Sequence, residues 1–481
     1  MGDSRRFPPA DVPADAPDPP TPTVPDTAQA HDVRAAVAAA LARALPHGGR
    51  IAIGFSGGRD SAVLLDAALA VRADARCDVV ALHVHHGLSA HADDWSRFCR
   101  DTCATLGVPF AMRRVCVEGG ARVSIEAAAR KARHAALAEL AQELDASAVL
   151  LGHHADDQAE TLLLQLFRGA GPRGLAAMPA AKFDRGLWWL RPLLGIPRAR
   201  IDGYAGLRDV RYVDDDSNDD SRYRRNALRH RVVPLLRAVA PGYPRTLLRA
   251  AELQADAATL LDDLARIDAR DACDGTTLDC AALRKLDRRR AQNLLRWFLR
   301  EQGLPAPSRA RLAEMLRQLA EAGRDAQVAL SHAGAWLGVH RGRVTLHRSP
   351  GAAFVREWTG AATIDLPHGV LVLRPQQGAG IAARHLAGPG VTIRSGVAGE
   401  RLQLAGRSTR RQVADLLRDA GIPHWDRLAL PRVYCGPALA AVAPLGVDVA
   451  FAAAHDEPAF ALDWHPATDR DEAPAPVRTD A

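Results

Sequence analysis

Residues 56–61, Ser-Gly-Gly-Arg-Asp-Ser, combine the groups that a phosphate-binding turn needs. Adjacent glycines let the backbone pass close to a ligand, and the free N–H groups at the start of a helix point toward an anion. The turn lacks the lysine of a Walker loop and does not follow the GxGxxG pattern. We therefore predict a different phosphate-binding loop, made of Ser56, Gly57, Gly58, Arg59, Asp60 and Ser61.

Asp60 is a carboxylate inside this predicted anion site. Such a charge is unfavourable next to phosphates unless a cation lies between them, and Mg²⁺ that bridges carboxylate and phosphate oxygens would resolve the conflict. The alternative is that Asp60 only caps the following helix. That alternative leaves the preceding Ser-Gly-Gly unexplained, so we predict a magnesium–nucleotide site with Asp60 as a metal ligand.

A second acidic group follows the histidine pair of Gly152-His153-His154. Asp157 and Glu160 are three positions apart, so on a helix they share one face. Acidic residues in a first helical turn ordinarily complement the helix dipole. Three carboxylates beside a nucleotide would nevertheless repel it, unless Mg²⁺ or a cationic substrate lies among them. The sequence leaves both cations open and makes Asp156 a second candidate metal ligand.

Basic residues stand near both groups in the sequence. Arg130 lies in a predicted helix over 124–144, and Arg191 precedes a Pro-Leu-Leu segment. An arginine-rich stretch then follows an acidic loop, and a solvated helix face is the usual explanation for such a run. We prefer contacts with a nucleic-acid backbone, because the run lies beside the predicted nucleotide site. Its five arginines are Arg222, Arg224, Arg225, Arg229 and Arg231.

Alternating strands and helices must position these groups. Apolar stretches of strand length alternate with helical stretches between residues 51 and 168, which is typical of a parallel sheet with helices on both faces. Ligands of such sheets bind where the carboxyl ends of strands meet helix N-termini. We therefore expect residues 56–61 and 152–160 at one edge. The predicted strands are 51–55, 78–83, 110–117 and 148–152, and the predicted helices are 62–71, 92–106, 124–144 and 157–168.

The sequence predicts two further domains after this α/β catalytic domain. A mainly helical substrate-binding domain with a strand-rich end comes first, with residues 245–320 expected to be helical throughout, and a small α+β domain follows. Pro-, Asp- and Ala-rich segments at both ends are predicted to be disordered. The expected boundaries are 1–30 for the first tail, 31–240 for the catalytic domain, 241–375 for the helical domain, 391–463 for the C-terminal domain and 464–481 for the last tail.

The composition argues against several other classes of protein. No apolar run reaches the ~20 residues that a membrane span needs. No signal-peptide pattern is visible, so we expect no membrane partner and a cytoplasmic location. Seven scattered cysteines, an odd number, argue against a disulfide framework. The formal net charge of +6 permits a polyanionic partner without proving one.

Two levels of family resemblance follow from these motifs. The Ser-Gly-Gly-x-Asp-Ser turn, placed first in an α/β sheet, resembles the loop of the N-type ATP pyrophosphatases. The order of further motifs resembles the bacterial tRNA(Ile) lysidine synthetases. The segments that carry this resemblance are SGGRDS, HVHHGL, EAAARKAR, GHHADDQAET, RGAGPRGLAAM, RPLL and DDDSN, with weaker similarity in RAQNLLRWFLREQGLPAPS and GERLQLAGRSTRRQVADLLRDAGIPHWDR.

The resemblance implies a two-step ligation with ATP and Mg²⁺. ATP adenylates the oxygen on carbon 2 of the wobble cytidine in the CAU anticodon of tRNA(Ile), releasing pyrophosphate. Free L-lysine then displaces AMP, which changes codon reading from AUG to AUA. The cytidine must leave the stack of the loop to reach such a site.

The resemblance also implies roles for individual residues. The phosphate loop would hold the departing pyrophosphate, with Asp60 and Mg²⁺ offsetting its charge. Asp157 and Glu160 would bind the lysine substrate, and Arg130 its carboxylate or a phosphate. His153 would accept a proton or make a structural hydrogen bond, and both roles stay open, as does a homodimer. The expected tRNA contacts are Arg191, Arg224, Arg225, Arg229, Arg407 and Arg411.

Some positions depart from the family's pattern, and two other functions remain as alternatives. Gln412 and Ala414 stand where lysines are frequent, which leaves the strength of acceptor-stem contact in doubt. A tRNA thiolase of the same fold would need paired cysteines near the ATP loop, and Cys99 and Cys103 have the wrong spacing. A non-catalytic RNA-binding protein is the other alternative, and the complete set of acidic residues argues against it.

Overall fold

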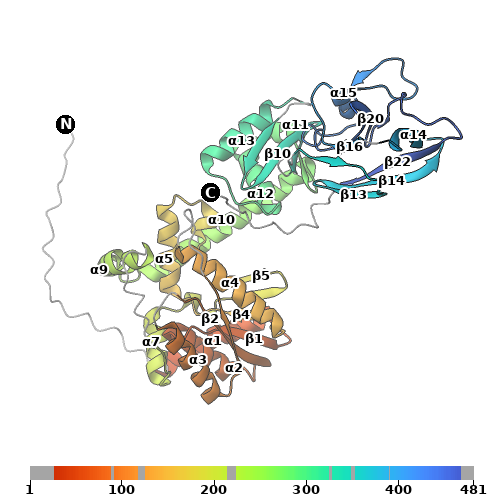
Figure 1. The fold of residues 1–481 in the computed structure, drawn as a ribbon. Coiled ribbons are helices and arrows are strands. Elements are labelled where there is room, and N and C mark those ends of the chain that lie inside the picture. Colours follow the sequence, from red (N-terminus) through yellow and green to blue (C-terminus); the bar gives the residue numbers. More distant parts are fainter. Residues whose placement is uncertain are drawn as a thin grey trace, which may run out of the picture. The chain divides into compact units, whose positions relative to one another are not determined.

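The computed structural model describes residues 26–87, 91–116, 125–213, 224–323, 328–347, 353–388 and 390–466. The chain forms two compact units, Met1–Leu260 and Leu261–Ala481 (Figure 1). The arginines expected at positions 222 and 224 are affected by these limits. Position 222 lies outside the described residues, and the side chain of Arg224 does so as well.

The first unit contains a six-stranded sheet in the order β3-β2-β1-β4-β6-β5. Neighbours from β3 to β6 are parallel, and only the edge strand β5 is antiparallel to its partner. The sheet confirms the predicted fold class, and the short apolar runs of its central strands suit burial on both faces. The strands are β1 (Gly49–Gly54), β2 (Cys77–His85), β3 (Phe110–Arg114), β4 (Ala148–Leu150), β5 (Ala181–Asp184) and β6 (Leu187–Leu190).

Helices cover both faces of this sheet. Successive side chains of a strand point to opposite faces, and β1 illustrates this because Ile51 and Ile53 belong to one core cluster and Ala52 to another. The first cluster packs against α1, α2, α3 and α7, and the second packs against α4 through Leu137 and its neighbours. The helices are α1 (Asp26–Ala44), α2 (Arg59–Val71), α3 (Ala92–Leu106), α4 (Ile125–Glu143), α5 (Ala155–Phe167), α6 (Pro172–Leu175) and α7 (Arg198–Leu207).

The chain after α7 returns to the sheet edge through a series of short helices. A π-helical turn, η3, joins two α-helices there, and a 3-10 turn, η1, precedes α7. The edge hairpin β5–β6 was not predicted, because four-residue strands give little periodicity. These further elements are η1 (Pro192–Gly195), α8 (Arg224–Ala227), η3 (Leu228–Val232), α9 (Val233–Val239) and α10 (Tyr243–Ala272).

The second unit begins with a five-stranded sheet that packs against α11, α12, α13 and the C-terminal end of α10. Its strand order is β7-β8-β11-β10-β9, and its apolar core includes Leu294, Phe298 and Met315 from the helices. The prediction of unbroken helix over residues 245–320 was wrong at the short β7–β8 hairpin. The elements are β7 (Cys273–Asp274), β8 (Thr277–Asp279), α11 (Cys280–Lys285), α12 (Arg288–Glu301), α13 (Arg309–Glu321), β9 (Ala329–His332), β10 (Ala335–His340) and β11 (Arg343–His347).

Two larger antiparallel sheets, the two-stranded sheet β17–β18 and two short helices complete the described part of the second unit. The strand orders of the two larger sheets are β12-β16-β19-β20-β21 and β13-β14-β22-β15, and β14 pairs with β22 along all nine of its residues. Across the described part of the chain, no helix is long and apolar enough to cross a membrane. The elements include β12 (Val355–Glu357), β13 (Thr363–Leu366), β14 (Gly369–Gln377), β15 (Ile381–Ala382), α14 (Ala383–Leu386), β16 (Val391–Arg394), β17 (Arg401–Leu402), β18 (Arg411–Gln412), α15 (Val413–Asp419), β19 (Arg432–Cys435), β20 (Ala438–Val442), β21 (Gly446–Val447) and β22 (Pro458–Pro466).

Candidate active site

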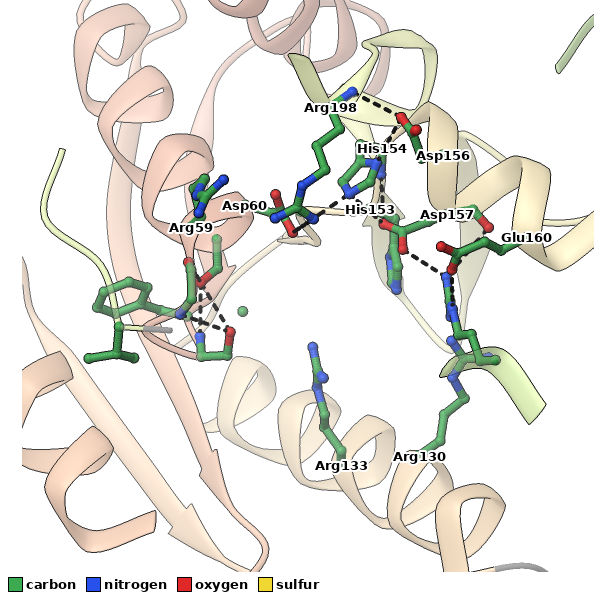
Figure 2. A pocket seen from close by; sticks show the side chains of 18 of the residues that line it. Arg59, Asp60, Arg130, Arg133, His153, His154, Asp156, Asp157, Glu160 and Arg198 are labelled. Atoms are coloured by element: carbon green, nitrogen blue, oxygen red, sulfur yellow. Dashed lines mark hydrogen bonds and ion pairs between the residues drawn. The ribbon is translucent and has the colours of Figure 1, made fainter. Parts of the chain in front are cut away.

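A cavity of about 600 Å³ lies at the carboxyl edge of the parallel sheet in the first unit. Its lining comes from the ends of β1, β2 and β4 and from α4, α5, α7 and the helical turns at residues 225–243. Figure 2 shows charged side chains of both signs converging on it. Because α/β sheets bind ligands at this edge, the cavity is the candidate active site.

Hydrogen bonds to its own serine hydroxyl groups stabilise the conformation of the loop after β1. The Ser56 N–H donates to Ser61 Oγ at 3.2 Å, and Ser61 Oγ donates to the Gly58 carbonyl at 2.8 Å. Gly57 has a φ of +88°, a conformation that favours glycine. A Cβ on Gly152, at the end of β4, would lie 2.9 Å from the Asp60 carbonyl carbon. Glycine at position 152 therefore lets the end of β4 lie in close contact with the backbone of Asp60.

The guanidinium group of Arg59 is held by contacts with two other residues. Its Nη1 donates to Asp202 Oδ1 on α7 at 2.6 Å, and its guanidinium lies 4.6 Å from the centre of the Tyr212 ring. A second arginine, Arg198 at the start of α7, lines the cavity and was not predicted. It lies within the unremarkable stretch Gly-Ile-Pro-Arg-Ala-Arg, so no sequence pattern marked it.

The surroundings of Asp60 are suited to binding a cation. Its Oδ1 atom is buried and has no hydrogen-bond partner among the residues that the structure describes. Burial raises the pKa of Asp60 above its ordinary value, although His154 and Arg198 attract the carboxylate and act in the opposite direction. The helix N-cap is Gly58, without a side-chain cap hydrogen bond. The geometry therefore gives no support to Asp60 as a helix cap.

An unpartnered carboxylate oxygen beside a phosphate loop fits a hard cation such as Mg²⁺. No group of three His, Cys, Asp or Glu side chains within the described ranges is arranged to hold a metal ion. Mg²⁺ commonly takes one or two carboxylates and completes its shell with water and substrate phosphates. Asp156 remains only a predicted ligand, since its Oδ2 accepts the Arg198 N–H at 2.9 Å.

His154 lies close to three acidic residues from the first turns of two helices, α2 and α5. Its side chain is 1% exposed, and its Nε2 lies 3.7 Å from Asp60 and 3.4 Å from Asp157, while its Nδ1 lies 3.7 Å from Asp156. Burial lowers the pKa of His154, but the three carboxylates outweigh burial and leave the pKa raised. The sequence contained the signal for this residue, a histidine doublet before three acids, but we gave it no role.

The neighbouring His153 lies in the opposite electrostatic setting. Burial, together with Arg191, Arg133 and Arg130, lowers its pKa far below the ordinary value against the attraction of Asp157. It is therefore a neutral imidazole at neutral pH. Arg130 and Arg133 project from α4 toward it (Figure 2), and both line the cavity. Arg133 was part of the quoted helix motif but received no predicted role.

The acidic pair on α5 is already occupied by two arginines. Arg225 donates to Asp157 Oδ1 and Glu160 Oε2, each at 2.7 Å. Arg229 donates to Glu160 Oε1 at 2.8 Å and to Oε2 at 3.0 Å. Glu160 is 3% exposed, so these are largely desolvated, charge-assisted hydrogen bonds. The acids that we expected to bind lysine and the arginines that we expected to bind tRNA therefore form ion pairs with each other.

Arg191, a further predicted tRNA contact in the first unit, is not among the described residues that line the cavity. Arg191 Nη1 donates to the Pro179 carbonyl at 2.9 Å. In the second unit, Arg411 pairs with Asp419 at 2.8 Å, and Arg407 is exposed. These three stay predictions, since each could still turn toward a phosphate.

The cysteines near the loop are part of the core. Cys99 and Cys103 are both fully buried, and burial raises the pKa of Cys99 to about 12 and that of Cys103 to about 11. A reactive cysteine needs an accessible thiolate. These two thiols therefore do not support the alternative of a sulfur-transferring enzyme.

Fold and loop together define an ATP-binding α/β domain. Residues 30–236 match the family described as PP-loop domain, residues 278–347 match the TilS substrate binding domain, and residues 391–464 match the TilS substrate C-terminal domain. The last two families account for most of the second unit.

Curated relatives extend this assignment along the chain. A tRNA(Ile)-lysidine synthase of Azoarcus sp. is 40% identical over 430 residues, which cover 89% of this chain and 94% of that protein. The enzyme of the same name from Chromobacterium violaceum is 42% identical over 429 residues, covering 86% and 95%. Among solved structures, U34-tRNA thiolase NcsA from Methanococcus maripaludis is similar at 17% identity and a TM-score of 0.42, covering 48% of this chain and 80% of that chain.

The chain belongs to the tRNA(Ile)-lysidine synthase family, whose members are ATP-dependent ligases built on a PP-loop domain. This assignment confirms the resemblance drawn from the motifs and the predicted class of enzyme. It also accounts for a nucleotide loop and an acidic group sharing one cavity, because ligases of this type must bind ATP and a second substrate together.

Proposed function

We propose that the chain joins free L-lysine to carbon 2 of the wobble cytidine in the CAU anticodon of tRNA(Ile), with ATP and Mg²⁺. The product would be lysidine, and codon reading would change from AUG to AUA. The observation that carries the proposal is the buried pair Asp157 and Glu160, which binds two guanidinium groups in the same cavity as the phosphate loop. These guanidinium groups stand in for the cationic ends of lysine.

The first step would activate the cytidine. Its carbon 2 oxygen attacks the α-phosphorus of ATP, the bond to the β-phosphate breaks, and pyrophosphate leaves. Backbone N–H groups of the loop and the hydroxyl of Ser56 would hold the departing charge, the hydroxyl in exchange for its 3.2 Å contact with Ser61 Oγ. Mg²⁺ held by Asp60 would neutralise part of that charge. Arg198 lies on the same side of the cavity as Asp60 and adds a second cation (Figure 2).

The second step would form the carbon–nitrogen bond. The lysine ε-amine attacks carbon 2 of the adenylated cytidine, and AMP leaves with the activated oxygen. Asp157 and Glu160 would orient the lysine, after at least one of their arginine contacts is exchanged for it. The attacking amine must be uncharged and loses a proton as it attacks. His153 is neutral and can accept a hydrogen bond from the amine, but its pKa of about 3 makes it a weak base, so the proton would pass on to solvent.

Attachment of labelled lysine tests this function directly. The full chain is incubated with ATP, Mg²⁺, labelled L-lysine and an unmodified tRNA(Ile) transcript, with the initiator tRNA carrying the same CAU anticodon as the matched control. We expect label on tRNA(Ile) alone. No label on either RNA, with ATP consumed normally, would exclude the proposed reaction. Light scattering on the same preparation distinguishes a monomer from a homodimer. We also propose that the enzyme acts in the cytoplasm.

Separating the half-reactions tests the roles of the acidic pair. The variants Asp157→Asn and Glu160→Gln should form adenylated tRNA from ATP without lysine, as the wild type should. They should then need about 30-fold or more lysine to complete the reaction, because each has lost a desolvated charge partner. Variants that form no adenylate would assign these acids to the ATP site instead.

A further inference from the structure

A second concave surface lies next to the active cavity in the first unit. This groove encloses about 390 Å³ and is formed by the C-terminal end of α5 and one side of the α8–η3 segment. Four of its seven lining residues are aliphatic, one is a phenylalanine and two are arginines. The residues that line it are Leu164, Phe167, Arg168, Ala227, Leu228, Arg231 and Val232.

The groove and the active cavity share one helical segment. Arg225, Asn226, Arg229 and His230 line the cavity, whereas the interleaved residues 227, 228, 231 and 232 line the groove. The same holds for α5, whose first turns line the cavity and whose last turn lines the groove. A helix with its side chains is about 10 Å across. A ligand strand that leaves the cavity over this segment therefore meets the groove.

Phe167 leaves an unusually large apolar face in water. Phe167 is 69% exposed and ends α5, whose apolar residues nearer the start, Ala155, Ala159 and Leu162, are buried. The guanidinium groups of Arg168 and Arg231, which line the same groove, make no hydrogen bond or ion pair to any part of the chain that the structure describes, and both residues are exposed. An exposed aromatic ring near unpaired guanidinium groups is typical of sites for single-stranded nucleic acid. In such sites bases stack on the ring and phosphates contact the cations.

We propose that this groove binds an unstacked nucleobase of the RNA, a neighbour of the nucleotide that reacts. Phe167 stacks on the base, and Arg168 and Arg231 contact the adjoining phosphates. This inference rests on the proposed function. A nucleotide that leaves its loop to react takes a stacking partner away from its neighbours. A ring one helix away from the cavity replaces that partner and so lowers the cost of holding the loop open.

Photocrosslinking locates the contact. Transcripts of tRNA(Ile) carry 5-iodouridine or 2-aminopurine at single positions beside the reacting cytidine. With the full chain, we expect irradiation to join the iodinated base to the peptide that contains Phe167, and the fluorescence of 2-aminopurine to fall when it stacks. A crosslink that maps to another peptide from every position overturns the proposal.

Substitutions test the energetics. Phe167→Ala should weaken binding of the transcript about 5- to 100-fold, and Phe167→Trp should restore it. Leu166→Ala and Phe183→Ala are matched controls, because these exposed apolar residues do not line the groove. Arg168→Gln and Arg231→Gln should each lower the slope of log affinity against log salt by about 0.7. Equal affinities for Phe167→Ala and the controls would overturn the proposal.

The outcomes separate this inference from the proposed function. A wild-type chain that neither binds the transcript nor attaches lysine contradicts both. A wild type that binds and modifies RNA, with Phe167→Ala indistinguishable from it, contradicts the groove alone. If Phe167→Ala changes self-association in light scattering and leaves RNA binding unchanged, the groove is a protein contact, and the proposal is wrong.

Discussion

Asp60 and Asp157 are neighbours in the cavity but lie in opposite electrostatic states. Asp157 is bonded to Arg225 and to the His154 backbone, and its pKa is lowered despite the opposing effect of burial. Asp60 keeps a buried oxygen without a partner in the described structure, and burial raises its pKa. A protein tolerates such an uncompensated group mainly where function needs it. At the scale of single residues, Asp60 is therefore the strongest candidate for a functional carboxylate.

The first prediction concerns the chemistry of Asp60. Asp60→Asn keeps the size of the side chain and removes its charge, so the proposed Mg²⁺ would lose its protein ligand. We expect release of AMP and pyrophosphate to fall by about 10²–10³-fold, while the affinity for tRNA stays within twofold or so of wild type. Single-turnover assays with labelled ATP measure the first quantity and filter binding the second. Wild-type rates in the variant would refute a role for Asp60 in the reaction.

The same substitution has a predicted effect on stability. A carboxyl group whose pKa is raised by folding binds its proton more tightly in the folded state, so its contribution to stability is present at low pH and is lost as pH rises through the folded pKa. At neutral pH the ionised Asp60 therefore destabilises the unliganded fold. Asp60→Asn should raise the melting temperature at pH 7, and the difference should vanish as pH falls below about 4. An unchanged or lower melting temperature at pH 7 would contradict this account.

Arg198 is another residue of the cavity for which a test can be stated. Its guanidinium makes no side-chain hydrogen bond within the described ranges, and its only ion pairs are long, at 4.0 Å to Asp60 and 3.9 Å to Asp202. Its donors are therefore available for a phosphate. Arg198→Gln should weaken ATP binding about 10- to 100-fold. Arg200→Gln, on the same helix but paired with Asp32, is the control for calorimetric titration with ATP. Equal losses in both variants would mean a structural effect only.

Residue types predicted the anion loop, but not how the charges pair. Glycine, serine and acidic residues at a strand–helix junction are local signals, and the loop at 56–61 needs no other part of the chain to be recognised. The contact of Arg225 with Asp157 joins positions 68 residues apart. It depends on where α8 docks on α5, and the pattern of residue types along the chain contains no information about that docking. The sequence did not identify Arg198 for the same reason, because only the packing of α7 brings this side chain to the cavity.

At the scale of elements, the docking of the α8–η3 segment on α5 is the feature with the clearest consequence. Asp157 and Glu160 hold Arg225 and Arg229 in a site that the proposed lysine must enter. Lysine and these arginines compete for the same carboxylates, whereas tRNA phosphates offer the arginines another partner. Binding of tRNA should then make the acids available to lysine, which would favour an order with tRNA first.

Substituting these arginines tests the competition. Arg225→Gln and Arg229→Gln should bind lysine about tenfold more tightly than wild type in the absence of tRNA. They should bind tRNA more weakly, with the slope of log affinity against log salt reduced by about 0.7–0.9 for each arginine. Arg249→Gln, an exposed arginine on α10, controls for net charge. Unchanged lysine affinity together with an unchanged salt slope would make the ion pairs purely structural.

The same scale explains which elements the sequence predicted well. The parallel strands β1, β2 and β4 are short runs of buried apolar residues, and the structure keeps them within a few residues of the expected bounds. The hairpins β5–β6 and β7–β8 consist of strands of two to four residues. Strands that short show too few alternations to be distinguished from loops or helix ends, and their pairing partners decide their conformation.

At the scale of the whole molecule, the chain contains separate hydrophobic cores. The sheet of the first unit is buried between two clusters that include Ile53 and Leu137, and the second unit has its own clusters around Phe298, Leu371 and Leu417. The nucleotide cavity belongs to the first unit alone. Units with independent cores need not unfold together, so a ligand of one unit can stabilise it selectively.

The last prediction follows from this separation. Scanning calorimetry of the full chain should show two transitions, and ATP with Mg²⁺ should raise only the one that belongs to the first unit. At about 100 times the dissociation constant, a ligand adds about 2.7 kcal/mol, which corresponds to about 5–10 °C for a unit of this size. Asp60→Asn should abolish the shift and leave the other transition in place. A single transition that moves as a whole would mean that the units unfold as one cooperative body.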